Sequence, residues 1–313
     1  MRQLLGSVAA LSLGFCLLVG CSLDDKGSDP DEAVETGRAD DSASPPGDSG
    51  GDSAEDSGED GGDSGGDDSG GDDSGGDDGG DDGGDDGGDD GGTLPDGSPP
   101  LGATSGGSGG SDHPSSTILS AGGSTYHLLV PSGVSSATGV CFLMVYSGTE
   151  GATQMMSNMR QVAPYFELDD CLVAVLDGTS SSAADGATVL DAVRADYDVD
   201  NDRTWLLSES AGTREGLVLG LDSRQAWFAA YWANDVNTAA TPSRTASELG
   251  FAPWGNAGPG GDLPNATVIV DGMRAAGYQL PADAPYSGAG STTHGSTDQF
   301  VAAVSFFSDK RRQ

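Results

Sequence analysis

A long run of Asp, Gly and Ser constrains the fold of this chain more than any other feature. The run extends from Ser22 to about Ser111 and is densest in the DSGGD and DDGG repeats of Asp63–Gly92. Because it holds almost nothing that could be buried, the entropy lost on ordering it cannot be offset. We therefore expect a disordered tether over residues 21–112 and one folded domain over residues 113–313, although length alone would suggest about two domains.

Calcium-binding repeats are the alternative interpretation of this run. Such repeats place an apolar residue in each unit to build a buried core, and the DDGG units contain none. The spacer interpretation therefore fits the composition better. The three histidines of the whole chain are scattered and no CxxC pair occurs. We expect neither a metal site nor a cofactor.

The charge argues against a nucleic-acid partner. The chain has 50 acidic residues against 13 Lys and Arg, and its formal net charge is −37. Affinity for nucleic acid comes mostly from contacts of Lys and Arg with phosphates. Such contacts are scarce in a chain of this composition.

The first 20 residues have the layout of a secretory signal peptide. Met1 and Arg2 give a positive start, and the apolar run Leu4–Val19 is too short and glycine-broken for a good membrane span. The run ends in Leu18-Val19-Gly20-Cys21, which resembles the lipoprotein box of bacteria. The alternative is an ordinary secretion signal that happens to carry a cysteine.

The lipoprotein resemblance implies that the signal is cleaved before Cys21 and that this cysteine is acylated. Several acyl chains on one residue make a stable membrane anchor. Ser22 follows the cysteine, which resembles the class of lipoproteins passed on to the outer membrane. We therefore expect a lipid-anchored protein of the bacterial cell envelope, at the outer membrane or cell surface.

Apolar runs alternate with amphipathic segments in the C-terminal part. An apolar run without alternation, such as VCFLMVY at 140–146, is typical of a strand buried on both faces of a parallel sheet. Strands are predicted at 126–130, 140–146, 171–176, 204–207, 228–233 and 251–254, and helices at 153–166, 188–197, 213–221, 267–276 and 299–307. This order predicts an α/β fold, a mostly parallel sheet with helices on both faces.

One turn carries the strongest indication of chemistry. Residues 204–212 read TWLLSESAG, a buried strand followed by a serine and then a helix. A serine on a sharp strand-to-helix turn presents its hydroxyl above the sheet, and the next backbone N–H faces a developing oxyanion. Strand and helix pass close together there, so small residues are needed on both sides. Gly212 fills one place, and Ser208 stands where glycine is usual.

The stretch Tyr197–Gly212 resembles the Tyr-x-Val-Asp-x-x-Arg region and nucleophile turn of secreted α/β-hydrolases, the polyhydroxybutyrate depolymerase and feruloyl esterase type. The resemblance implies an α/β-hydrolase domain that cleaves an extracellular ester through a covalent acyl-enzyme. It implies Ser210 as the nucleophile, with oxyanion-hole N–H groups from Ala211 and from Thr149 or a neighbour. The family histidine of that second loop is absent here.

The general base follows from chain order, because the triad of this fold runs Ser…Asp…His. His294 is the one histidine downstream of Ser210. An exposed loop histidine and a helix-capping serine are the structural alternatives. For the acid we favour Asp262, because it precedes a predicted helix, while Asp235 at the end of the preceding strand stays open.

Two further features have two interpretations each. The four tryptophans, Trp205, Trp227, Trp232 and Trp254, pack in the core or line an aromatic pocket. Cys141 and Cys171 each open a buried strand, and these strands are neighbours in the α/β-hydrolase order. A disulfide is therefore expected in an oxidising compartment, and two buried free thiols are the alternative.

Two functions remain open on the sequence alone. The first is a monomeric, surface-tethered serine carboxylesterase. The second is a degenerate α/β-hydrolase-fold lipoprotein with a binding or structural role. Ser208 and Gly258 motivate the second function, because they stand where the family has glycine and aspartate.

Overall fold

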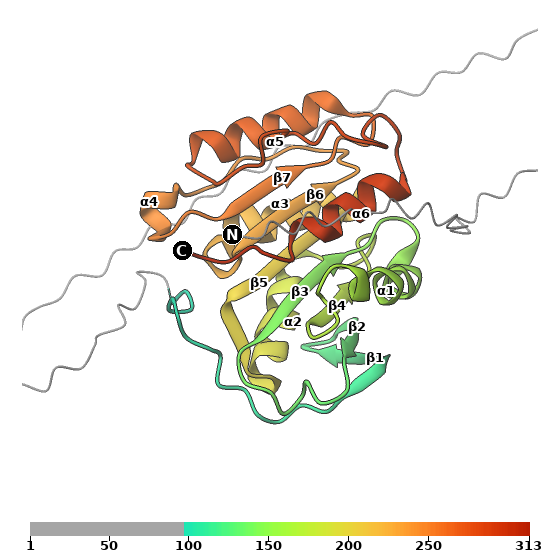
Figure 1. Cartoon of the computed structure of the whole chain (residues 1–313), viewed down its shortest axis with the longest axis vertical. Coiled ribbons are helices and arrows are strands. Elements are labelled where there is room, and N and C mark those ends of the chain that lie inside the picture. Colours follow the sequence, from blue (N-terminus) through green and yellow to red (C-terminus); the bar gives the residue numbers. More distant parts are fainter. Residues whose placement is uncertain (1–96) are drawn as a thin grey trace, which may run out of the picture. The chain divides into compact units, whose positions relative to one another are not determined.

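The computed structural model describes residues 97–313. The expected signal peptide, Cys21 and most of the expected tether lie outside the described residues. The described part contains a seven-stranded sheet in the order β1-β2-β4-β3-β5-β6-β7 (Figure 1). The strands are β1 (His113–Ala121), β2 (Ser124–Val130), β3 (Val140–Tyr146), β4 (Leu172–Leu176), β5 (Val199–Glu209), β6 (Ala230–Asn234) and β7 (Trp254–Ala257).

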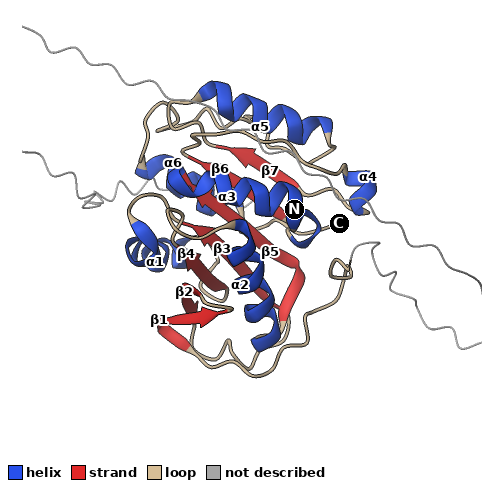
Figure 2. Ribbon diagram, turned by 180° about the vertical axis from the view of Figure 1, so that it is seen from behind, coloured by secondary structure: helices blue, strands red, loops and turns tan. Residues whose placement is uncertain are grey.

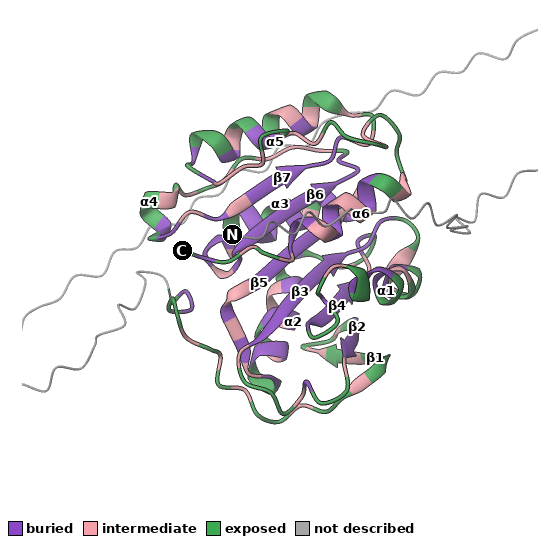
Figure 3. Cartoon of the chain, viewed as in Figure 1, coloured by how far each residue is buried: buried purple, intermediate pink, exposed green. Residues whose placement is uncertain are grey.

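The sheet is mostly parallel, as predicted. Strand β2 pairs antiparallel with both β1 and β4, whereas β4, β3, β5, β6 and β7 pair in parallel. Strand β3 is buried along its whole length, and Figure 3 shows the other central strands buried as well. The apolar runs of the sequence are therefore strands covered on both faces.

Helices cover each face of the sheet. They are α1 (Gly151–Val162), α2 (Ala183–Asp196), α3 (Thr213–Val218), α4 (Ala246–Leu249), α5 (Leu263–Ala275) and α6 (Thr297–Phe306). Alternate residues of β3 enter two separate cores. Met144 packs with residues of α2, α3 and α5, whereas Leu143 packs with residues of α1 and α6. Figure 1 shows α1 and α6 before the sheet, and α2 comes forward in the reverse view of Figure 2.

Besides shifted ends, such as β5 beginning at Val199 and α3 ending at Val218, three elements differ from the prediction. The strand expected at 251–254 begins only at Trp254, because Phe251 packs in a separate small cluster with Ala226 and Leu249. Strand β1 was not predicted, since its sequence HPSSTILSA is largely polar. It lies at the edge of the sheet, where one side of each strand needs no partner. Helix α4 spans only four residues, too few to give a periodic pattern.

The folded unit begins before residue 113, which corrects the expected boundary of the tether. Thr104 forms a β-bridge with Asp200, and the Ser105 N–H donates to the Val199 carbonyl at 2.8 Å. Gly107 passes so close to the chain that an added Cβ would lie 2.6 Å from the Tyr197 carbonyl oxygen. Residues 98–112 thus pack along β5 and the end of α2, largely through backbone contacts.

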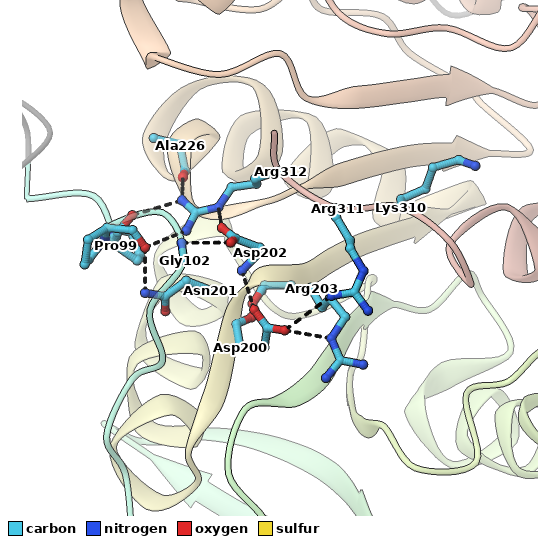
Figure 4. A network of polar contacts seen from close by, with 12 residues as sticks. Pro99, Gly102, Asp200, Asn201, Asp202, Arg203, Ala226, Lys310, Arg311 and Arg312 are labelled. Atoms are coloured by element: carbon cyan, nitrogen blue, oxygen red, sulfur yellow. Dashed lines mark hydrogen bonds and ion pairs between the residues drawn. The ribbon is translucent and has the colours of Figure 1, made fainter. Parts of the chain in front are cut away.

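The C-terminus fastens this early segment (Figure 4). The Arg312 guanidinium is buried, with 3% of the residue exposed, and donates to the carbonyls of Pro99 at 3.0 Å and Pro100 at 3.1 Å. It also donates to the Ala226 carbonyl at 3.2 Å and to Asp202 Oδ1 at 3.0 Å. One side chain therefore joins the two ends of the folded unit to β5.

The predicted disulfide is confirmed. Cys141 and Cys171 are bonded, and their Cα atoms lie 4.7 Å apart. The two cysteines stand at corresponding ends of β3 and β4, which pair in parallel from Phe142 and Leu172. A bridge across 30 residues stabilises the fold by roughly 3–4 kcal/mol when loop entropy in the unfolded chain is the main term.

Replacing Arg312 by alanine should lower the free energy of unfolding by about 3–5 kcal/mol, because Asp202 would then be left without its buried partner. Arg311 provides a matched control. Its side chain is 55% exposed and its ion pair with Asp200 measures 3.9 Å, so Arg311→Ala should change stability by less than about 1 kcal/mol. Urea denaturation of both variants measures the difference. Equal losses would show that the Arg312 contacts do not fasten the ends.

Candidate active site

Ser210 lies on a sharp turn between β5 and α3. Its φ is +48°, a conformation that side-chain-bearing residues rarely adopt. A short 3-10 turn, Ser210–Gly212, leads directly into α3 at Thr213. The predicted strand–serine–helix arrangement is therefore present, with the backbone strain typical of a nucleophile turn.

Gly212 is required by close packing rather than by its backbone angles. A Cβ at this position would lie 2.6 Å from the Ser147 carbonyl oxygen and 2.7 Å from the Tyr146 Cβ. Both neighbours belong to the end of β3 and the loop that follows. The helix after the nucleophile therefore packs directly on the loop from which an oxyanion-hole N–H was expected.

The side chain of Ser208, which stands where glycine is usual, fits between β5 and α3. Its hydroxyl is buried and lies 2.7 Å from the Tyr231 hydroxyl of β6. Space for the side chain comes from Gly216 of α3, where an added Cβ would lie 2.3 Å from the Ser208 Cβ. The residue without a side chain is therefore on the facing helix α3 instead of on the strand, and β5 and α3 can still pack closely.

His294 lies against Ser210. The Ser210 Oγ and the His294 Nε2 are 2.8 Å apart, the distance of a hydrogen bond between nucleophile and base. The histidine belongs to the loop between α5 and α6 and is exposed to solvent. Two residues separated by 84 positions are thus brought together, as chain order predicted.

Asp235 supports the histidine loop from the end of β6. It is fully buried, and its Oδ2 accepts the Gly295 N–H at 2.5 Å. Its Oδ1 accepts a hydrogen bond from the Gln299 side chain of α6. Burial raises the pKa of Asp235, whereas the Gly295 N–H, the charge of His294 and the Gln299 amide act in the opposite direction. A buried carboxylate therefore lies beside the histidine.

Asp262, the acid favoured from the sequence, serves another purpose. It caps α5, accepting the Asn265 N–H at 3.2 Å and the Asn265 side-chain amide at 2.9 Å. Gly258 has no room for a carboxylate either, because an added Cβ would lie 2.8 Å from Asn234 Oδ1 and 2.9 Å from Gln299 Cδ. The structure thus places Asp262, the acid preferred from the sequence, at the cap of α5, and it places Asp235, the alternative left open, against the histidine loop.

The order of these parts identifies the architecture. A serine turn follows a central parallel strand, a buried aspartate follows the next strand, and a histidine loop precedes the last helix. The chain has the α/β-hydrolase fold. The expected fold class is confirmed.

The loop after β3 lies beside the nucleophile. An added Cβ at Gly148 would lie 3.1 Å from the Ser210 Cβ, which places the expected oxyanion loop in contact with the serine. Thr149 is exposed in this loop, and Ala211 follows the serine at the start of the 3-10 turn. The Gly148 N–H donates to Glu150 Oε1 at 3.0 Å, a contact that the sequence did not indicate.

Carboxyl groups crowd this site. Burial raises the pKa of Glu209, the residue before the nucleophile, well above its ordinary value, and the charges of Glu150 and Asp235 act in the same direction. Its Oε2 atom is buried and has no hydrogen-bond partner. Glu150 is exposed as a residue, but partial desolvation of its carboxyl group raises its pKa, as do the charges of Asp177 and Asp235, although the N–H groups of Glu150 and Gly148 oppose the shift.

Two polar cavities adjoin these residues. A cavity of about 510 Å³ is lined by Glu150, Asp177 and Asp185 among other residues, and one of about 480 Å³ by Ala211, Arg214 and Glu215. The two share Ser180 and Ser181. Among residues 97–313, no group of three His, Cys, Asp or Glu side chains is arranged to hold a metal, and no helix is both long and apolar enough to cross a membrane.

The four tryptophans lie in or against the hydrophobic cores. The prediction that they pack in the core is therefore favoured over an aromatic pocket. Trp205 and Trp232 are buried, with partners Phe307 and Phe306. Trp227 lies under the guanidinium groups of Arg194 and Arg224, and Trp254 under the Lys310 ammonium. None of the four lines the two cavities beside the nucleophile turn.

Comparison with known proteins gives distant structural similarities. No protein-family model matches the sequence, and no curated protein matches it. A thermostable esterase structure is 15% identical with a TM-score of 0.47, covering 63% of each chain. A thermophilic carboxylesterase cloned from a metagenomic library is 17% identical with a TM-score of 0.32, covering 56% of this chain and 62% of its own.

An esterase from the archaeon Pyrobaculum calidifontis is 14% identical with a TM-score of 0.32, covering 53% of this chain and 56% of its own. The chain therefore spans less than two thirds of each of these three structures.

The unpaired carboxyl of Glu209 gives a pH-dependent prediction. Because its pKa is raised in the folded state, folding retains a proton that the unfolded chain loses above the ordinary glutamate pKa. The resulting destabilisation is absent at acidic pH and grows as the pH rises toward the folded-state pKa. Glu209→Gln should therefore raise the free energy of unfolding at pH 8 by about 1–3 kcal/mol and change it little at pH 4. A gain of equal size at both pH values would contradict this account.

Proposed function

We propose that the protein is a serine carboxylesterase. The observation that carries the proposal is the 2.8 Å contact between the Ser210 Oγ and the His294 Nε2, made by a serine on a strained turn. A serine hydroxyl is a weak nucleophile until an adjacent base takes its proton. The same serine performing only a helix cap would not need this partner.

The chemistry that this arrangement supports is acyl transfer in two steps. His294 Nε2 takes the Ser210 proton while Oγ attacks the ester carbonyl carbon, and the carbonyl electron pair moves to oxygen. When the carbonyl re-forms, the C–O bond to the alcohol breaks and His294 returns the proton to the leaving alcohol. Water then repeats the sequence on the acyl-enzyme, which releases the acid and restores Ser210.

Asp235 acts as the acid of this proposal. Its carboxylate is buried beside the histidine and anchors the histidine loop through the Gly295 N–H and, by way of Gln299, through α6. A buried carboxylate at this place orients the imidazole and stabilises the imidazolium that forms during each step. Gly260 leaves room for it, since an added Cβ would lie 2.4 Å from Asp235 Oδ1.

The two residues that favoured a degenerate binder, Ser208 and Gly258, both have structural explanations. Ser208 is accommodated by Gly216 and bonded to Tyr231, so it does not open the nucleophile turn. Gly258 is compensated by a carboxylate from the preceding strand. Both departures from the family pattern therefore have local explanations compatible with activity.

Alanine at Ser210 or His294 should each lower turnover of short p-nitrophenyl esters by at least about 10³-fold, and the double variant should be little worse than either single one. The reason is that the two side chains act as one unit. Labelling by a fluorophosphonate probe, read by mass spectrometry, should place the adduct on Ser210. Turnover that survives Ser210→Ala, or a wild type inert to both reagents, would end the proposal.

The same esterase assay distinguishes the two candidate catalytic acids, Asp235 and Asp262. Asp235→Asn should lower kcat by roughly 10²–10⁴-fold, because the imidazolium loses its buried counter-charge. Asp262→Asn should leave kcat nearly unchanged and cost at most about 1 kcal/mol of stability through the weakened cap of α5. The reverse order of kcat values would restore Asp262 as the acid.

The location of the enzyme is a separate part of the proposal and rests on the sequence Leu18-Val19-Gly20-Cys21. We propose that acylation of Cys21 anchors the protein in the bacterial cell envelope. Cys21→Ser should move the protein from the detergent phase to the aqueous phase in a partitioning assay, while its esterase activity is kept. Unchanged membrane association would refute the anchor without touching the active site.

A further inference from the structure

Glu150 occupies an unexpected place in the oxyanion loop. Its Oε1 accepts the Gly148 N–H at 3.0 Å. The side chain therefore folds back over its own loop, directly before α1 begins at Gly151. This contact links Gly148 to the Glu150 side chain across Thr149.

The same carboxylate lies close to the nucleophile. A Cβ built on Gly148 would lie 2.5 Å from Glu150 Oε2 and 3.1 Å from the Ser210 Cβ. Both groups therefore border the same small volume at the Gly148 backbone. A carbonyl oxygen that becomes negative in this region would develop its charge near an existing carboxylate.

Two other carboxyl groups act on Glu150. Asp177 lines the same cavity, and Asp177 and Asp235 interact electrostatically with Glu150. The nearby cation is Arg214, which lines the adjoining cavity but has an 81% exposed side chain. His127 lies across the first cavity, 3.3 Å from the Thr153 hydroxyl. No buried cation in this part of the described chain neutralises the carboxyl groups.

On the basis of the proposed esterase function, we propose that Glu150 is a positioning and charge-selecting residue: it holds the oxyanion loop through Gly148 and disfavours esters that carry negative charge beside the scissile bond. The site should accordingly prefer neutral or cationic esters. The two roles rest on different properties of one side chain. Positioning needs an acceptor oxygen, whereas selection needs the negative charge.

Two substitutions separate these properties. Glu150→Gln keeps an oxygen that accepts the Gly148 N–H but removes the charge, whereas Glu150→Ala removes both. Glu248→Gln is the matched control, because Glu248 also accepts a backbone N–H, that of Thr245 at 2.7 Å, but caps the remote helix α4. The control should leave all kinetic constants unchanged.

Three acetate esters of similar size provide the charge series: those of choline, of 3,3-dimethylbutanol and of 3-hydroxypropanesulfonate. The wild type should give the lowest kcat/KM with the sulfonate. In Glu150→Gln the ratio of cationic to anionic kcat/KM should fall on the order of tenfold, as expected for removing one charge at short range. In Glu150→Ala, kcat for the neutral ester should fall about tenfold or more, because the loop N–H is no longer held for the transition state.

The outcomes separate this inference from the function on which it rests. An active wild type whose cation-to-anion ratio is unchanged in Glu150→Gln would overturn charge selection. Equal kcat of Glu150→Ala and wild type on the neutral ester would overturn positioning. A wild type inert to all three esters and to the fluorophosphonate probe would overturn the esterase proposal, and this inference with it.

Discussion

The close approach of three chain segments at the carboxyl edge of the sheet is the constraint on which the site depends. A Cβ at Gly178, after β4, would lie 1.9 Å from the Ser147 carbonyl oxygen and 2.5 Å from the Gly212 Cα. The backbones of the loops after β3, β4 and β5 therefore lie in close contact, and the Gly178 N–H also donates to the Ser147 hydroxyl at 3.2 Å. A side chain at Gly178 or Gly212 would push the loop after β3 away from Ser210, so these glycines keep that loop close to the serine.

Much of this arrangement could be predicted because short stretches of the sequence indicate it. The apolar runs of β3, β4 and β5 predicted their burial, the sequence SESAG predicted the turn at Ser210, and His294 followed from chain order. The disulfide between Cys141 and Cys171 followed from the neighbouring places of two strands. Each of these predictions depends on a few adjacent residues or on the order of the strands in the fold. None of them requires the conformation of a loop to be known.

The remaining parts depend on contacts between distant loops, which leave little trace in composition. The segment 98–112 is rich in Gly and Ser like the preceding run, yet it is held by a backbone hydrogen bond to Val199 and by Arg312. Asp235 and Asp262 both follow a strand or precede a helix, so local sequence cannot rank them. Only the path of the histidine loop, with Gly295 against Asp235, decides between them.

The surroundings of Asp235 show how a carboxylate is held beside the histidine loop from the end of β6. Gly258 cannot carry a carboxylate, because Asn234 and Gln299 fill the space. Gln299 in turn bridges Asp235 and the Gly260 N–H, which lies 3.0 Å from its Oε1. The glutamine thus joins the loop after β7 to the acid after β6. The loop after β7 is therefore connected through Gln299 to the carboxylate that follows β6, and this carboxylate accepts the N–H of Gly295, next to His294.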